Sequence, residues 1–222
     1  MYLLCNINII KKLYMCFNIA IKTKLVSVEK QLNVKLQNTS IFHCNTHISA
    51  FSNPKIPTII SKNTKQIELF YWGLIPSWIN GEDKAEKIRR MTYNARAETL
   101  QEKPSFKEYI KQNKCLIIAD GFYEWQTTNF GKVCHYIERK NQELITFAGV
   151  WSDWYNNASG KVIRSVSIIT QPANAMMEKI HNIKKRQPVI IKNQYRDEWF
   201  NSKLSYSSII DDCFSISLSN TI

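Results

Sequence analysis

Cys115-Leu-Ile-Ile-Ala-Asp-Gly-Phe-Tyr-Glu-Trp125 is the stretch of sequence that decides the fold. Its first five residues, 115–119, form an apolar run that is typical of a buried strand. Asp120-Gly121 ends this run, and the Asp-Gly dipeptide is frequent in β-hairpins. We therefore expect a hairpin turn at these two residues.

Strands outnumber helices on both sides of this stretch. Strands are expected over 67–72, 133–138, 144–151, 162–170 and 188–192, and helices over 25–36, 105–112, 173–180 and 195–200; residues 58–60 form a short apolar run. Residues 81–90 are expected to form an exposed loop or a short helix. Because hairpins rather than helical crossovers join the strands, the sequence predicts one β-rich α+β domain, mainly antiparallel, without repeats or an internal linker.

The composition is that of a globular protein with a large excess of positive charge. Hydrophobic residues make up 44% and charged residues 22% of the 222 residues, which argues against the disordered and membrane classes. The net charge of +12 favours nucleic acid as a partner, although a genome rich in lysine codons gives the same bias. No two of the six cysteines form a C-x-x-C pair, so we expect reduced thiols in a cytoplasmic protein and no zinc site.

Residues 1–15 are expected to lie outside the domain. The apolar segment 1–10 is followed by Lys11 and Lys12, lacks the features of a signal peptide, and is far shorter than the roughly 20 apolar residues of a spanning helix. We interpret 1–15 as a mis-assigned or removable extension. The domain then covers 16–222, with a Ser-rich, mobile end after about residue 201.

Cys16 follows Met15, which has the character of a second start site. If Met15 is the initiator and is later removed, Cys16 carries a free α-amine beside its thiol. Such an amine captures an aldehyde, and the thiol then closes a thiazolidine ring, which an internal cysteine cannot do. The alternative is an ordinary buried cysteine, because cysteine is among the residue types most often buried.

Two motifs carry candidate contacts to nucleic acid. Trp72 opens W-G-L-I-P-S-W (72–78), and a tryptophan beside a Gly/Pro turn either stacks on unpaired bases or packs at the base of the loop. Asn94 and Arg96 belong to N-A-R-A-E-T (94–99), where the amide offers a donor and an acceptor and the guanidinium a fork for phosphate. The alternative for this motif is a helix cap with a surface salt bridge.

Two further residues are candidates for proton transfer. Glu124 lies among the aromatic residues of G-F-Y-E-W (121–125), and an apolar setting raises the pKa of a carboxyl group. Alternation along a strand would instead leave Glu124 in solvent. His181 closes a predicted helix, where it acts either as an acid–base group or as a charge partner of the helix dipole.

In this order, Cys16, W-G-x-I-P-x-W, N-A-R-A-E-T, G-F-Y-E-W, T-x-x-A-N and I-H resemble the SOS-response-associated peptidase (SRAP) family. The resemblance runs from Cys16 to about residue 192 and is most specific in N-A-R-A-E-T and G-F-Y-E-W. Members of this family crosslink covalently to abasic sites in single-stranded DNA. The resemblance implies one compact SRAP-like domain, with antiparallel strands in a barrel-like core, a few peripheral helices and a positively charged DNA channel.

The resemblance also implies roles for individual residues. Catalytic roles fall to Cys16, Asn94, Glu124 and His181, and DNA contacts to Trp72, Arg96 and Thr170. Arg186 is a further expected DNA contact, from the basic segment after His181. Cys16 corresponds to the family's nucleophile, Asn94 to the residue that orients its amine, and Glu124 and His181 to the acid–base pair. Trp72 corresponds to a base-stacking position, Arg96 to a phosphate contact and Thr170 to the wall of the DNA channel.

The expected activity is that of a monomer that shields abasic sites in single-stranded DNA through a thiazolidine at Cys16. It is expected to need neither metal nor cofactor, and to work in the cytoplasm at the nucleoid as part of the DNA damage response. One alternative is a thiol peptidase that uses Cys16 and His181, with an activity limited to the removal of its own first residues. Another is a non-catalytic single-stranded DNA binder with a basic surface and Trp72.

The sequence departs from the family pattern at three places. Phe17-Asn18 stands where the family usually has Gly-Arg, so one phosphate contact is missing. Ala50 replaces a proline after an early strand. The usual H-x-R-M-P is three residues longer and more basic here, as His181-Asn-Ile-Lys-Lys-Arg-Gln-Pro188, and Arg186 is expected to supply replacement charge.

Overall fold

The computed structural model describes residues 17–36, 43–201 and, as backbone alone, 214–218. Strands dominate this part of the chain. They are β1 (Asn18–Ile21), β2 (Lys35–Leu36), β3 (Asn45–Ser49), β4 (Lys55–Ile60), β5 (Asn63–Trp72), β6 (Asn94–Arg96), β7 (Lys114–Ala119), β8 (Gly121–Thr128), β9 (Gly131–Arg139), β10 (Ile145–Asn156), β11 (Lys161–Pro172), β12 (Arg186–Pro188), β13 (Ile190–Ile191) and β14 (Phe214–Leu218). The helices are α1 (Leu25–Leu32), α2 (Glu82–Arg89), α3 (Tyr109–Gln112), α4 (Ala175–Ile180) and α5 (Arg196–Asn201).

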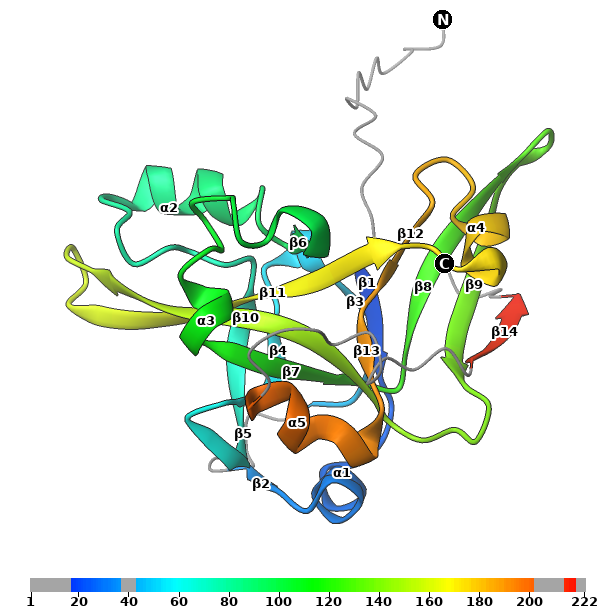
Figure 1. The fold of residues 1–222 in the computed structure, drawn as a ribbon, viewed down its shortest axis with the longest axis horizontal. Helices are drawn as coiled ribbons and strands as arrows, with labels where there is room; N and C mark the ends of the chain where they lie inside the picture. Colours follow the sequence, from blue (N-terminus) through cyan, green and yellow to red (C-terminus); the bar gives the residue numbers. More distant parts are fainter. Residues whose placement is uncertain (1–16, 37–42, 202–213, 219–222) are drawn as a thin grey trace, which may run out of the picture.

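The strands form two sheets, and the larger one closes on itself. β4 pairs with β5 and β7, β7 with β10, and β10 with β11, all antiparallel; a parallel pairing of β11 with β5 completes a ring of five strands. The smaller sheet has the order β14-β9-β8-β1-β3. In Figure 1, the long β10–β11 hairpin projects to the left, away from β8 and β9. The expected mainly antiparallel, β-rich fold with a barrel-like core is confirmed.

Asp120-Gly121 is where the chain passes from one sheet to the other, and the expected hairpin is wrong. β7 lies in the larger sheet, whereas β8 pairs with β1 and β9 in the smaller one. Asp120 fixes this crossing, because its backbone N–H donates to Ala20 (2.8 Å) and its carboxylate accepts from the backbone of Thr23 (3.0 Å). Gly121 is required here, since a Cβ would lie 2.5 Å from the Tyr136 ring.

Both faces of the apolar run 115–119 are buried. Cys115, Ile117 and Ala119 face a core that includes residues of β1 and β8, whereas Leu116 and Ile118 face a second core that α1, α3 and α5 complete. A strand covered on both sides reads as continuously apolar rather than alternating, which explains this stretch of sequence. The run therefore lies between the small sheet and the helices.

Several predicted elements change length or type. The helix expected over 25–36 ends at Leu32, because Asn33 is left-handed (φ 53°), and Leu36 belongs to β2. The helix expected over 105–112 is reduced to α3, and residues 82–89 form α2. The helix expected over 173–180 begins after Asn174, whose Oδ1 accepts from Met177 N (2.9 Å).

The described residues cover little of the two ends of the chain, where the domain boundaries were predicted. Residues 1–16, and with them Met15 and Cys16, lie outside the described residues. Within the Ser-rich end, residues 214–218 form β14, which pairs antiparallel with β9. Among the helices that the structure describes, none has the length and apolarity needed to span a membrane.

Candidate functional site

The candidate residues are carried by two neighbouring parts of the fold. β6, the end of β11 and β12 form one part, with β6 parallel and β12 antiparallel to β11. β8 and α4 form the other, and α4 packs against β8 (Figure 1). Because α4 follows β11 directly and leads into β12, it joins the two parts.

Asn94 and Arg96 lie on β6, next to β11. The register places Asn94 beside Ile168 and Arg96 beside Thr170. Arg96 is exposed, and Asn94 is half-buried. An exposed guanidinium at the end of a short strand is available to a phosphate, which fits the role expected for Arg96.

Trp72 lies in the core behind β6 and offers no surface for stacking. Its exposed fraction is 0%, and its indole Nε1 donates to the backbone oxygen of Tyr93 (3.0 Å), directly before Asn94. The expected base-stacking surface at Trp72 is therefore absent, and the residue supports the start of β6 instead. Trp78, at the other end of the same motif, is 56% exposed.

Arg186 and Thr170 are also buried rather than facing a channel. Arg186 forms an ion pair with Glu98, and its Nη2 donates to Glu98 Oε2 (2.9 Å) and to the backbone oxygen of Thr170 (2.8 Å). The hydrogen bond from Arg186 holds the pKa of the Glu98 carboxyl below its usual value. The expected DNA contacts of Arg186 and Thr170 are not supported by this geometry, because Arg186 ties β12 to β11 and to the segment after β6.

His181 ends α4 in a buried position, with an exposed fraction of 5%. Its Nδ1 lies 3.0 Å from the backbone oxygen of Arg186. A carbonyl oxygen only accepts hydrogen bonds, so Nδ1 carries the proton of the neutral ring and Nε2 keeps its lone pair. Burial, aided by the positive charges of Arg186 and Lys184, lowers the pKa of His181 and favours this neutral form.

Glu124 is buried on β8, with an exposed fraction of 3%. The alternative in which strand alternation leaves it in solvent is therefore wrong. Its neighbours Tyr123 and Trp125 belong to a cluster on the opposite face of the small sheet, whereas Phe122, on the same face as Glu124, packs in the main core. Glu124 thus points toward the side of β8 that α4 covers.

Phe17, the first described residue, leads into β1 beside β8. Ile19 pairs with Phe122 and Ala20 with Gly121, so the same antiparallel register continued by two residues brings Phe17 level with Glu124. The rings of Phe17, Phe51 and Tyr93 contact one another, with centroids 5.1–5.7 Å apart. Phe17 therefore packs against Tyr93, the residue directly before Asn94, at the start of β1.

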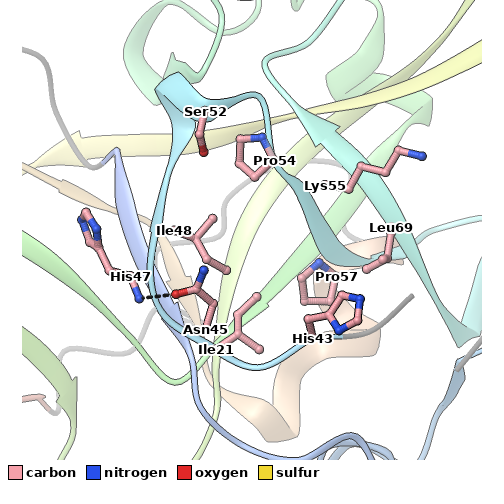
Figure 2. A pocket seen from close by; sticks show the side chains of 10 residues that line it. All are labelled: Ile21, His43, Asn45, His47, Ile48, Ser52, Pro54, Lys55, Pro57 and Leu69. Carbon is pink, nitrogen blue, oxygen red and sulfur yellow. Dashed lines mark hydrogen bonds between the residues drawn. The ribbon is translucent and has the colours of Figure 1, made fainter. Parts of the chain in front are cut away.

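A cavity of about 370 Å³ lies elsewhere, at the other end of β1 (Figure 2). Apolar side chains such as Ile21, Ile48 and Leu69 line it, together with His43. The ring of His47 points away from these apolar side chains, and its Nε2 lies 2.8 Å from Asn18 Oδ1. Of the expected catalytic residues that the structure describes, Asn94, Glu124 and His181 do not line this cavity. No group of three or more metal-ligating side chains occurs within the residues that the structure describes.

Comparison with known proteins identifies the family. The model of the SOS response associated peptidase (SRAP) family matches residues 15–216. The chain belongs to the SRAP family. Among curated relatives, the abasic site processing protein YoqW of Bacillus subtilis is 34% identical over 192 residues, which cover 85% of this chain and 81% of that protein. The abasic site processing protein HMCES of Xenopus tropicalis is 34% identical over 138 residues, or 54% of this chain and 40% of that protein.

Solved structures confirm the architecture. A crystal structure of a protein from Bacteroides thetaiotaomicron superposes with a TM-score of 0.86 at 31% identity, and the match covers 93% of each chain. A protein from Bordetella bronchiseptica shares the fold, with a TM-score of 0.77 at 20% identity over 92% of this chain. The SRAP resemblance expected from the sequence is confirmed.

Sequence reasoning missed two features of the site. The first is the contact of Phe17 with Phe51 and Tyr93. The one feature of the sequence that pointed to it was Phe17 at a position where the family usually has Gly. The second is Asn182, whose side chain bonds to the backbone of Thr127 on β8. A polar residue directly after His181 gave no indication of a partner 55 residues earlier in the chain.

Proposed function

We propose that this chain captures abasic sites in single-stranded DNA through a thiazolidine at Cys16. One observation supports the proposal: β1 pairs with β8 at Ile19–Phe122 and Ala20–Gly121, and the residue two positions further along β8 is the buried Glu124. The SRAP relatives named as abasic site processing proteins support the same substrate. The net charge of +12 suits a polyanionic partner.

The proposed chemistry needs two bonds to the sugar. An abasic deoxyribose opens to an aldehyde, and the α-amine of Cys16, with a pKa near 8, is partly unprotonated at neutral pH. The amine attacks the aldehyde carbon, water leaves, and an imine forms. The Cys16 thiol then adds across the C=N bond, with sulfur joining carbon and the thiol proton going to nitrogen.

Glu124 and His181 share the proton transfers in this scheme. His181 is neutral at pH 7 with Nε2 unprotonated, so it accepts the proton that the attacking amine loses. Glu124 acts as the general acid for the aldehyde oxygen, which leaves as water. Asn94 orients the Cys16 amine, Arg96 contacts a phosphate, and Trp78 replaces Trp72 as the indole with an accessible face.

The mechanism requires that residues 1–15 be absent from the working protein. We propose that they are removed, or never made, and that Cys16 itself takes part in removal as a thiol nucleophile with His181 as its base. The unprotonated Nε2 of His181 favours this second activity. A Cys16→Ala protein that still loses residues before position 16 would exclude self-cleavage.

The experiment compares a form starting at Cys16 with its Cys16→Ala variant on three oligonucleotides: an abasic strand, an intact strand, and a strand with a tetrahydrofuran site that cannot form an aldehyde. The proposal predicts a denaturant-resistant complex with the abasic strand alone, and none with Cys16→Ala. Equal binding of all three strands without a covalent complex would favour the non-catalytic DNA binder. A Cys16→Ala variant that crosslinks like the parent would overturn the mechanism.

A further inference from the structure

The segment 182–185 between α4 and β12, called here the α4–β12 loop, folds back on His181. Lys185 adopts a left-handed backbone (φ 50°), and its N–H donates to the carbonyl oxygen of His181 (2.8 Å). The Lys185 carbonyl oxygen accepts from Ala173 N (2.9 Å), before α4. The loop that is three residues longer than the family pattern is thus closed at its base, while Ile183 and Lys184 are exposed.

Asn182, the first residue of this loop, is bound to β8 by both ends of its amide. Its Oδ1 accepts from the backbone N–H of Thr127 (3.1 Å), and its Nδ2 donates to the backbone oxygen of Thr127 (2.8 Å). One residue earlier on β8, the Gln126 side chain donates to the backbone oxygen of Lys179 in α4 (3.0 Å). The end of α4 is therefore fastened to β8 at two successive residues.

The Asn182 amide occupies an edge of β8 that β1 leaves open. In an antiparallel pair, the N–H and C=O of one residue point to the same side of the strand. β9 pairs along the other side of β8, and the described pairing of β1 with β8 reaches Phe122. The Asn182 side-chain amide thus takes the place of a paired residue on a neighbouring strand. It satisfies the backbone N–H and C=O of Thr127, which would otherwise bond to water.

From this geometry we infer that Asn182 is a positioning residue that fixes His181 relative to Glu124. The inference rests on the proposed function. His181 is bonded directly to Asn182, and Glu124 lies three residues from Thr127 on the same strand. Because a strand is rigid, the attachment of the Asn182 amide to Thr127 fixes the position of the His181 imidazole relative to the Glu124 carboxyl group. Among the described contacts of the loop itself, the hydrogen bonds of Asn182 are its attachment to β8.

The test separates positioning from binding. Asn182→Ala removes both hydrogen bonds, and Asn182→Asp keeps the shape but sets a carboxylate oxygen against the Thr127 carbonyl. Both variants should crosslink an abasic strand about 10- to 100-fold more slowly at saturating DNA, as expected when a catalytic group is displaced by about 1 Å. Their affinity for a tetrahydrofuran strand should stay within about twofold of the parent, because Asn182 contacts no DNA in this scheme.

Thr128→Val is the matched control. It removes two hydrogen bonds at the next residue of β8, from Thr128 Oγ1 to Gly131 O (2.8 Å) and from Phe130 N to Thr128 Oγ1 (3.2 Å), without touching α4. Its crosslinking rate should match the parent. Rates are compared well below the lowest thermal midpoint of the set, so that all variants are folded.

Two results would overturn the inference: variants of Asn182 that crosslink at the parent rate, or variants whose DNA affinity falls while the rate at saturation is kept. The proposed function is tested separately, by whether the parent protein forms the covalent complex. If the parent forms no covalent complex, the proposed function fails; if it does and the Asn182 variants match it, only the positioning role fails.

Discussion

Removing the Glu98 carboxylate should destabilise the fold by about 2 kcal/mol, because it leaves Arg186 buried without its charge partner. The Arg186 side chain is 9% exposed, and both of its terminal nitrogens bond to Glu98. After Glu98→Ala, Nη2 keeps its hydrogen bonds to the backbone oxygen (2.8 Å) and Oγ1 (3.1 Å) of Thr170. The variant therefore weakens the attachment of β12 to β11 without emptying the core.

The magnitude follows from two limits. Breaking a fully buried ion pair costs about 3–5 kcal/mol, and a single hydrogen bond to a charged group contributes about 1.5–3 kcal/mol. Glu98 is 44% exposed, so water replaces part of the lost interaction and the lower end applies. For a chain of this size, about 2 kcal/mol corresponds to a fall of roughly 4–8 °C in the thermal midpoint. Glu98→Gln keeps an acceptor and should lose about half as much.

Thermal unfolding at a series of pH values provides the assay. The pKa of Glu98 is lowered in the folded protein, chiefly by the hydrogen bond from Arg186. Such a carboxyl stabilises the fold above its unfolded pKa of about 4.3, and the contribution is lost as the pH falls through the lower folded value. The difference between parent and Glu98→Ala should thus be largest near neutral pH and shrink below about pH 4. Equal midpoints at pH 7 would refute the structural role of Arg186.

Three further outcomes follow from the structure. Gly121→Ala should destabilise by about 1–3 kcal/mol or more, because the new Cβ would lie 2.5 Å from Tyr136 Cζ and 2.6 Å from Ile137 O; unchanged urea unfolding would contradict this. Arg96→Ala should reduce the salt dependence of single-stranded DNA binding by about 0.7 in slope, the contribution of one phosphate, and an unchanged slope would exclude the contact. Burial lowers the pKa of His181, so the unfolded chain takes up this proton first and stability falls below about pH 6.5. His181→Gln should lose less stability than the parent between pH 7 and 5, and parallel pH profiles would argue against a buried neutral His181.

The strands and the family were predictable because their signals are local. The run 115–119, the strand before Trp72 and the two long strands that flank the turn at 157–160 each carry enough apolar residues to define a strand. The motifs N-A-R-A-E-T and G-F-Y-E-W are specific in order and spacing, which is why the SRAP resemblance extends over most of the chain. The hairpin predicted at Asp120-Gly121 was wrong because an Asp-Gly pair indicates a change of chain direction. It does not indicate whether the strands before and after it pair with each other.

The accessibility of individual side chains was not predictable, because it depends on contacts between residues far apart in the sequence. Trp72 is buried since its indole N–H reaches the backbone before β6, 21 residues later. Arg186 faces Glu98, 88 residues earlier in the chain, rather than solvent. A sequence motif does not show whether its tryptophan or arginine contacts DNA or stabilises the packing of two strands. The burial of Glu124 and His181, by contrast, agrees with the acid–base roles that we propose.

The most direct test of the central claim is tandem mass spectrometry of the crosslinked protein after digestion. The account predicts an adduct on the peptide that begins at Cys16, with the mass of the sugar-containing DNA remnant less one water, and with the fragment ions placing it on that first residue. It also predicts that protein retaining Met15 carries no adduct. An adduct on a lysine side chain, or on a chain in which Met15 still precedes Cys16, would contradict the thiazolidine mechanism.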